Sequence, residues 1–283
     1  MVYRAGFPPC FLPEVPRLRE ILSFMGTGAL SQPAGQEVGV IHLGIIVGVL
    51  SEARSLAKYS ITNDEPVRLR EGVTLGVSGV GPRRAGLAAR RLLEKGATAL
   101  LSWGSAGGLS PKLSPGSLIL PKIIVASDRS VYHADPSWHK DLCDRLRGQV
   151  EFHTGPLAES ATVVQTSAEK AILFQQTGAI GVDMESAAVA AVAQEAKVPF
   201  VAVRVVADSA DLPLPSSALN ACDEFGRLNF LKLIRGVAEC PKELFSLIRL
   251  ARDYRAAQRT LTLVARLIGS DLLLPQVGRR ERQ

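Results

Sequence analysis

Cysteine and aromatic residues are both scarce in this sequence of 283 residues. The four cysteines, Cys10, Cys143, Cys222 and Cys240, lie far apart and form no CxxC pair. This spacing argues against a zinc ribbon and a disulfide framework, and it favours a reducing compartment. Phe, Trp and Tyr make up only 5% of the residues, and the arginines are scattered. Nucleic-acid-binding surfaces usually combine a basic stripe with aromatic side chains, so we expect no nucleic-acid partner.

Long apolar runs are absent as well. No stretch approaches the roughly 20 apolar residues that a membrane-spanning helix needs. The N-terminus has no basic segment followed by an apolar stretch, which a secretory signal would show. We therefore expect a cytoplasmic protein. Its formal net charge of +6 indicates a solvated basic surface with some attraction for anionic partners.

The apolar content of 47% is ample for a globular fold, and the length is near the upper limit for one hydrophobic core. We expect an N-terminal extension over residues 1–40, rich in Pro and Gly, with one helix at Val15–Met25. The main domain is expected over 41–240, and a C-terminal helical segment over 241–283.

Apolar runs alternate with helix-forming segments through the main domain. We predict strands at 41–49, 73–78, 97–103, 117–125, 151–155 and 199–206, and helices at 51–55, 83–95 and 184–195. Continuous apolar runs are typical of strands buried on both faces. Strands that alternate with helices imply an α/β fold with a largely parallel sheet.

A glycine-rich stretch, Gly104-Ser105-Ala106-Gly107-Gly108, follows one of these predicted strands. Small residues let backbone N–H groups approach an anion or a sugar closely, but a tight strand exit also needs glycine. The stretch matches neither G-x-G-x-x-G nor G-x-x-x-x-G-K-[ST]. The sequence therefore supports neither a dinucleotide site nor a P-loop.

Two acidic residues stand at the ends of predicted buried elements. Glu185 lies in the segment Val182–Ser186, and Asp208 closes the apolar run 199–207. An unpaired carboxylate in such a place is costly and usually has a function. The alternative is structural: Glu185 as an early-helix acid favoured by the helix dipole, and Asp208 as a cap of the next turn.

Five motifs occur in an order that resembles the purine nucleoside phosphorylase and methylthioadenosine/adenosylhomocysteine nucleosidase superfamily. They are Gly79–Pro82, Trp103–Leu109, Pro115–Ile119, Val182–Ser186 and Val203–Asp211. Within that superfamily, Gln165–Lys170 and Leu250–Ala257 are similar to segments of the hopanoid-biosynthesis-associated phosphorylases. The resemblance covers about residues 43–235. It implies three layers, in which helices flank a central mixed, largely parallel sheet, and it implies a homo-oligomer. We expect no metal and no cofactor.

The resemblance implies cleavage of a purine N-glycosidic bond, and the residue types fit that chemistry. As the bond breaks, the ribose gains oxocarbenium character and electron density flows into the base. By resemblance, Asp208 is the acid near N7 of the departing purine. Glu185 then holds the ribose hydroxyls, and Met184 packs on the sugar. Asp183 is expected either to be structural or to hold one of these site residues in place.

The sequence leaves open which nucleophile attacks the sugar. The superfamily's nucleosidases activate water with a glutamate just after the first strand, and Glu52 is the acid near that point. When Gly48 is aligned with the family's strand-end glycine, however, Ala53 stands at the expected position and Glu52 precedes it by one residue.

A phosphorylase would instead need an anion site. The candidates are Gly104, the backbone and hydroxyl of Ser105, and the side chains of Arg54 and Arg83. Resemblance to the hopanoid subgroup implies this route, with inorganic phosphate as co-substrate.

Substrate identity depends on the outer half of the predicted pocket. Trp103, Val163 and Val164 are apolar and fall near places where the family contacts the base or the 5′ substituent; core packing is the alternative for the two valines. Ser105 and Gly107 are assigned to the substrate as well.

The subgroup resemblance implies release of adenine from adenosylhopane, a purine nucleoside with a large lipid at the 5′ carbon, in hopanoid side-chain biosynthesis. One alternative is a hydrolytic nucleosidase of the 5′-methylthioadenosine/S-adenosylhomocysteine type. Another is a non-catalytic nucleoside- or lipid-binding protein on the same fold.

A lipid-linked substrate would sit in a membrane, so contact with the inner membrane surface is expected. The segment 241–268 reads as one basic amphipathic helix, which can lie on an anionic membrane surface. The alternative is that this helix packs on the core or on a partner subunit.

Overall fold

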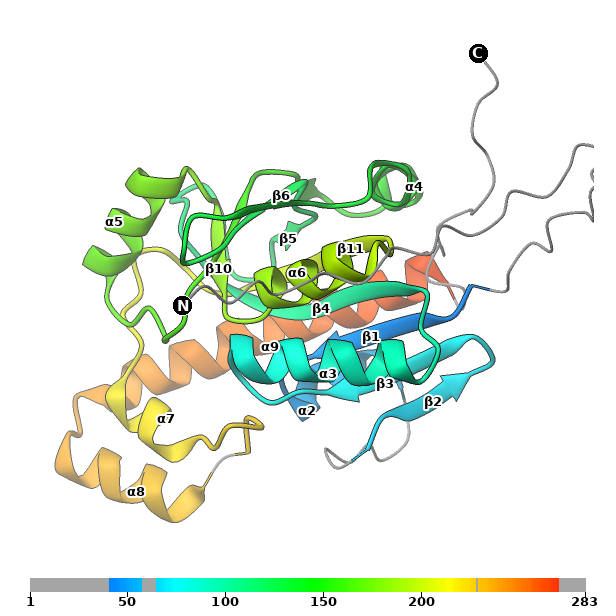
Figure 1. Ribbon diagram of the computed structural model, residues 1–283. Helices are drawn as coiled ribbons and strands as arrows, with labels where there is room; N and C mark the ends of the chain where they lie inside the picture. Colours follow the sequence, from blue (N-terminus) through cyan, green and yellow to red (C-terminus); the bar gives the residue numbers. More distant parts are fainter. Residues whose placement is uncertain (1–40, 58–64, 228, 270–283) are drawn as a thin grey trace, which may run out of the picture. The chain divides into compact units, whose positions relative to one another are not determined.

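The computed structural model describes residues 41–57, 65–227 and 229–269 (Figure 1). The chain divides after Gly39 into two units, and all the described residues belong to the second unit. The helix expected at Val15–Met25 lies outside the described residues.

Eleven strands of the described residues form one mixed sheet. They are β1 (Leu43–Val47), β2 (Val67–Arg70), β3 (Val73–Val77), β4 (Ala99–Gly108), β5 (Leu118–Ile119), β6 (Ile123–Val125), β7 (Val131–His133), β8 (Phe152–His153), β9 (Leu157–Glu159), β10 (Gly181–Asp183) and β11 (Phe200–Asp208). At its centre, β4 pairs in parallel with β1 and β11 and antiparallel with β10. The predicted mixed sheet is confirmed.

Helices cover both faces of the sheet (Figure 1). They are α2 (Leu50–Leu56), α3 (Pro82–Glu94), α4 (Pro136–Leu146), α5 (Ser167–Thr177), α6 (Ser186–Ala196), α7 (Ser216–Ala221), α8 (Phe230–Glu239) and α9 (Glu243–Ile268). Helices α3 and α6 pack against each other on one face, whereas α2, α4 and α9 cover the other. This arrangement confirms the predicted three layers. It also explains why β1 is buried along its whole length without polar alternation.

The glycine-rich stretch Gly104–Gly108, expected to follow the strand predicted at 97–103, is instead the second half of strand β4. Gly104 and Ser105 pair with Arg204 and Val205 of β11, and Gly107 and Gly108 pair with β10. Because partners lie on both sides, the ladder holds a glycine-rich segment that has little strand propensity of its own.

Another prediction fails at a proline. The strand predicted at 117–125 is two short strands, β5 and β6, with Pro121 between them. Proline has no N–H to donate to a ladder, which accounts for the break.

The C-terminal helix α9 combines a buried and an exposed half. Ala257, Leu261, Val264 and Ile268 are buried with residues of β1, β4 and β11 in one apolar cluster. Nearer the start of the helix, Phe245 is 81% exposed. Of the two arrangements considered for this helix, packing on the core is therefore the one seen for its second half. Among the helices in the described part of the chain, none combines the length and apolar character needed to cross a bilayer.

Candidate active site

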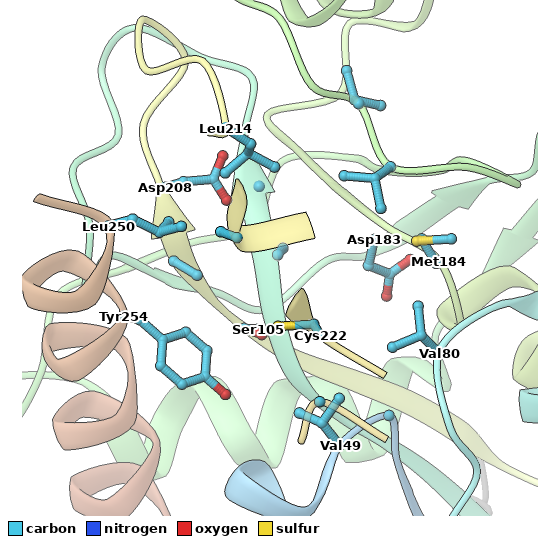
Figure 2. Close-up of a pocket in the computed structure, with 18 of the residues that line it drawn as sticks. Val49, Val80, Ser105, Asp183, Met184, Asp208, Leu214, Cys222, Leu250 and Tyr254 are labelled. Atoms are coloured by element: carbon cyan, nitrogen blue, oxygen red, sulfur yellow. The ribbon is translucent and has the colours of Figure 1, made fainter. Parts of the chain in front are cut away.

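A cavity of about 560 Å³ opens where β1, β4 and β11 reach their C-terminal ends (Figure 2). Open α/β sheets place their ligands at this edge. Glu52, Glu185 and Asp208, the three predicted acids, all line the cavity. Figure 2 shows Asp208 on one side and Met184 with Asp183 on the other, while Leu250 and Tyr254 of α9 form part of the wall.

The carboxylate of Glu52 receives four hydrogen bonds from the backbone and side chains around it. Oε1 accepts from the backbone N–H and the hydroxyl of Ser105, both at 2.7 Å. Oε2 accepts from the backbone N–H groups of Gly48 and Val49, at 3.1 and 3.2 Å. A Cβ at Gly104 would lie 2.8 Å from this carboxylate, so glycine is required there. The backbone does receive an anion at this stretch, and that anion is Glu52.

The phase of helix α2 decides which of Glu52 and Ala53 faces the cavity. Ala53 is fully buried in the core, whereas Glu52, one residue earlier in the first turn of α2, faces the cavity. The structure thus places an acid at the expected point after β1 despite the shift in alignment.

Glu185 lies at the start of α6, where Oε1 accepts from the N–H of Gly81 at 3.0 Å. Loss of solvent around this carboxyl, together with the nearby charge of Asp183, raises its pKa to about 7. A Cβ on Gly48 would lie 3.5 Å from the carboxyl of Glu185 and 3.6 Å from that of Glu52. The two acids therefore face a common space beside Gly48.

Asp183 has a structural environment, as expected. Its carboxylate accepts from Arg204 Nε at 2.7 Å and from the Ser186 hydroxyl at 2.5 Å, and Arg204 also donates to the Ser102 hydroxyl at 2.7 Å. Arg204 and Asp183 are both buried. This network fixes the segment that carries Met184 and Glu185.

Asp208 is the last residue of β11, just after a bulge in its pairing with β4. The bulge places Asp208 opposite Gly107, where a Cβ would come within 3.5 Å of the carboxylate. The Asp208 carboxylate accepts a hydrogen bond from the ammonium group of Lys170 in α5. Burial raises the pKa of Asp208, while the charge of Lys170 acts in the opposite direction.

Sequence reasoning missed Lys170 as a site residue. The available signal was the capping box formed by Thr166 and Glu169, which fixes the start and the phase of α5. That phase turns the next residue, Lys170, into the protein, where it is 1% exposed.

The structure corrects four predicted contacts. Trp103 is fully buried, and its indole N–H donates to the Ser55 hydroxyl at 2.9 Å, so it belongs to the core. Arg54 and Arg83 are exposed and do not line the cavity. Gly104 also lies outside the cavity lining, and the space beside its Cα is occupied by the carboxylate of Glu52.

The remaining predicted substrate contacts do line the cavity. They are Ser105, Gly107, Val163, Val164 and Met184. Val163 is 38% exposed, whereas Val164 also packs against a small buried cluster. The alternative of core packing therefore applies in part to Val164 and does not apply to Val163.

An apolar outer wall was not foreseen from the sequence. It is formed by residues of α7 to α9 and the segments before them: Leu214, Ala218, Cys222, Leu233, Leu247, Leu250, Ala251 and Tyr254. Within it, the Tyr254 hydroxyl lies 2.6 Å from the Ser51 hydroxyl, which joins α9 to the helix that carries Glu52. Burial raises the pKa of Tyr254 to about 12, so its hydroxyl keeps its proton at neutral pH.

Comparison with known proteins identifies the family. The profile of the phosphorylase superfamily matches residues 43–235. The chain belongs to the phosphorylase superfamily. The expected superfamily is therefore confirmed, and so is the prediction of an enzyme of the nucleoside phosphorylase and nucleosidase type.

Curated relatives of this superfamily member include two 5′-methylthioadenosine/S-adenosylhomocysteine nucleosidases. The protein from Baumannia cicadellinicola is 30% identical over 193 residues, which cover 58% of this chain and 82% of the relative. The protein from Buchnera aphidicola is 26% identical over 213 residues, which cover 65% and 82% of the two chains.

Solved structures show the same fold. A putative 5′-methylthioadenosine/S-adenosylhomocysteine nucleosidase from Francisella philomiragia superposes with a TM-score of 0.60 at 19% identity, covering 80% of this phosphorylase-superfamily chain and 98% of its own. The futalosine hydrolase of Helicobacter pylori superposes with a TM-score of 0.57 at 18% identity, covering 80% and 97%.

Proposed function

We propose that this protein is a nucleosidase that hydrolyses the N-glycosidic bond of a 5′-substituted adenosine and releases adenine. The observation that carries the proposal is the position of Glu52. Its carboxylate occupies the anion site at Gly104 and Ser105, where a phosphorylase would need room for phosphate. A carboxylate held there beside Glu185 is placed to accept a proton from water.

The charge of the cavity also favours water over phosphate. Its described lining includes four carboxylates, Glu52, Asp183, Glu185 and Asp208, and contains no Lys, Arg or His side chain. Asp183 and Asp208 are paired with Arg204 and Lys170, but Glu52 and Glu185 have no cation beside them in the described lining, so a phosphate dianion would meet repulsion from these two carboxylates. Neutral water meets no such penalty.

The proposed reaction uses the three acids in separate roles. Glu185 accepts hydrogen bonds from the ribose hydroxyls and supports the positive charge that develops on the sugar. The bond from C1′ to N9 breaks, its electron pair stays on the purine, and Asp208 donates a proton to N7. Water adds to C1′, and its proton passes to Glu52. The Ser105 hydroxyl, the one donor to Glu52 free to rotate, can turn to admit that water.

The relatives support the same reaction class. The curated relatives from Baumannia and Buchnera are named as nucleosidases of 5′-methylthioadenosine and S-adenosylhomocysteine. One Helicobacter pylori structure at 18% identity contains 5′-methylthioadenosine in its active site. The expectation of phosphate as nucleophile has no corresponding support, because Arg54 and Arg83 do not line the cavity.

A Glu52→Gln variant tests this proposal. Wild-type protein should release adenine from 5′-methylthioadenosine. In the variant, kcat should fall by a factor of about 10²–10⁴, which is the usual contribution of a general base. Arg54→Gln is the matched control on the same helix, and it should retain wild-type kcat because Arg54 is exposed outside the cavity. Undiminished turnover by Glu52→Gln, or a comparable loss in Arg54→Gln, would overturn the proposal.

The outer wall supports a large apolar group at the 5′ carbon. Its residues are almost all apolar, and much of it comes from α9, beyond the matched residues 43–235. Adenosylhopane belongs to this class of substrate, and its assignment to this protein stays a prediction. Its test compares 5′-methylthioadenosine with 5′-alkylthioadenosines of increasing chain length.

Leu250→Trp sharpens that comparison, because Leu250 lines the outer wall and a larger side chain would fill it. We expect KM for the long-chain substrate to rise about tenfold or more, with KM for 5′-methylthioadenosine little changed. Equal effects on both substrates, or a wild-type preference for the short one, would contradict the assignment of the outer wall.

A further inference from the structure

Lys170 is a buried charge beside the acid that the proposed reaction needs. It projects from the first turn of α5 and is 1% exposed, with its ammonium group against the carboxylate of Asp208. A buried lysine is costly unless it is paired and hydrogen-bonded. Its position against Asp208 points to a role in the chemistry of that acid.

The hydrogen bonds of Lys170 account for all three of its protons. One goes to Asp208 Oδ2, and the others go to the carbonyl oxygens of Ser209 at 2.8 Å and Leu212 at 2.9 Å. An ammonium group has three donors, so none remains for a ligand. Lys170 therefore acts on the carboxylate and on the backbone that follows it, and not on the substrate.

This arrangement gives the two oxygens of Asp208 different surroundings. Oδ2 is held by Lys170, whereas Oδ1 receives no hydrogen bond from the residues that the structure describes. Because Asp208 also lines the cavity, Oδ1 is the oxygen available to carry a proton to a purine.

We infer that Lys170 is the positioning residue of Asp208: it fixes Oδ2 and the segment 209–212, directs Oδ1 to the leaving purine, and stabilises the carboxylate left after proton transfer. The inference rests on the proposed function. The proton moves from Oδ1 to N7 of the purine, the negative charge stays on Asp208, and the positive charge of Lys170 lies next to it throughout. Lys170 itself neither gains nor loses a proton.

Other charged groups face Asp208 from α9 and from the segment that follows β11. Asp253 of α9 raises the pKa of Asp208, and Arg249 of the same helix reaches the Ser209 hydroxyl at 3.5 Å and Asp211 at 3.4 Å. Arg249 is bound to these groups and lies 3.7 Å from Asp253. Of the described residues, Lys170 is the cation in direct contact with Asp208.

Lys170→Met removes the charge while keeping the approximate length of the side chain. With 5′-methylthioadenosine, kcat should fall about a hundredfold or more, with KM changed only a few-fold, because the interaction acts on the leaving group in the transition state. The alkaline limb of the pH profile of kcat should also move to higher pH. Asp208 must hold a proton to donate it, and removal of a cation raises the pKa of its carboxyl.

Two further variants separate positioning from folding. Gly178→Ala strains the left-handed C-cap at the far end of α5, where φ is 66°, so it should lower the melting temperature and leave kcat and the alkaline limb unchanged. Lys170→Arg keeps the positive charge and should return the limb toward its wild-type position. If Lys170→Met does not fold, Lys170→Gln carries the same prediction for the limb.

The outcomes distinguish this inference from the proposed function. Absence of adenine release by wild-type protein would refute the proposed function itself. Adenine release by wild type, with kcat unchanged in Lys170→Met or with kcat lowered and the alkaline limb unmoved, would refute the role of Lys170 alone.

Discussion

Glu52 and Glu185 share one space beside Gly48 but differ in their surroundings. Four donors are directed at Glu52, whereas Glu185 lies close to Asp183 in a poorly solvated position that raises its pKa to about 7. Neighbouring carboxyls whose environments differ in this way take different roles in catalysis. Here the difference fits a proton acceptor for water and a group that binds the sugar.

The raised pKa of Glu185 predicts an acid limb near pH 7. Glu185 must be ionised to support positive charge on the ribose, so kcat/KM should fall as the pH drops below about 7. Glu185→Gln should lower kcat/KM and abolish this limb. The measurement is the pH dependence of kcat/KM for both proteins; a wild-type profile that is flat through pH 7, or an unchanged limb in the variant, would contradict the assignment.

The direction of a side chain, which the sequence does not give, decided which residues could be assigned to the site in advance. Glu185 and Asp208 were found because they end buried elements, where acidic residues stand out. Trp103 and Ser105 lie two residues apart on β4 and share one face of the strand, yet Trp103 packs beneath α2 and Ser105 reaches the cavity. The environments of the two side chains differ because Trp103 lies beneath α2 and Ser105 lies beyond it. The apolar periodicity of the sequence does not predict where α2 covers the strand.

At the scale of elements, α9 joins the core to the cavity. Its buried half packs on the sheet, and Leu247, Leu250 and Tyr254 line the cavity. The sequence predicted this helix within two residues of its start at Glu243. It did not predict the contribution to the cavity, because that depends on packing against α2 and β11, which are distant in sequence.

Leu261 and Leu263 provide a matched pair for the buried half of α9. Leu261 is fully buried and Leu263 is 43% exposed. Leu261→Ala should lower the free energy of unfolding by about 2–5 kcal/mol, because it removes core contacts and leaves a cavity. Leu263→Ala should change it by about 0.5 kcal/mol or less. Urea unfolding measures both, and equal effects would show that α9 is not part of the core.

At the scale of the whole molecule, five apolar side chains of α8 and the start of α9 are exposed to solvent. They are Leu231, Ile234, Leu244, Phe245 and Ile248, and both Leu231 and Phe245 are 81% exposed. Lys232 and Lys242 are exposed in the same helices and their connection. Leu233 and Leu247 of the same two helices line the cavity. Exposed apolar side chains with basic neighbours are the combination that binds an anionic bilayer surface, so the membrane contact expected from the sequence is predicted at these helices.

Phe245→Glu tests the predicted membrane contact. Wild-type protein should co-sediment with phosphatidylglycerol-containing vesicles more than with phosphatidylcholine vesicles, and Phe245→Glu should weaken that binding because it replaces an exposed apolar side chain with a negative charge. Leu87→Glu is the control, since Leu87 is 50% exposed on α3. Absence of binding by the wild type, or an equal loss in both variants, would refute the contact. The homo-oligomer implied by the resemblance likewise stays a prediction.

The central claim is hydrolysis by water that Glu52 activates, and its most direct test is the dependence of adenine release on phosphate. Wild-type protein would be incubated with 5′-methylthioadenosine in phosphate-free buffer and again with added phosphate, with adenine measured by chromatography and sugar phosphate by ³¹P NMR. We expect equal rates of adenine release in both buffers and no sugar phosphate, because the Glu52 carboxylate occupies the anion site. Release of adenine only with phosphate, matched by an equal amount of sugar 1-phosphate, would contradict the claim.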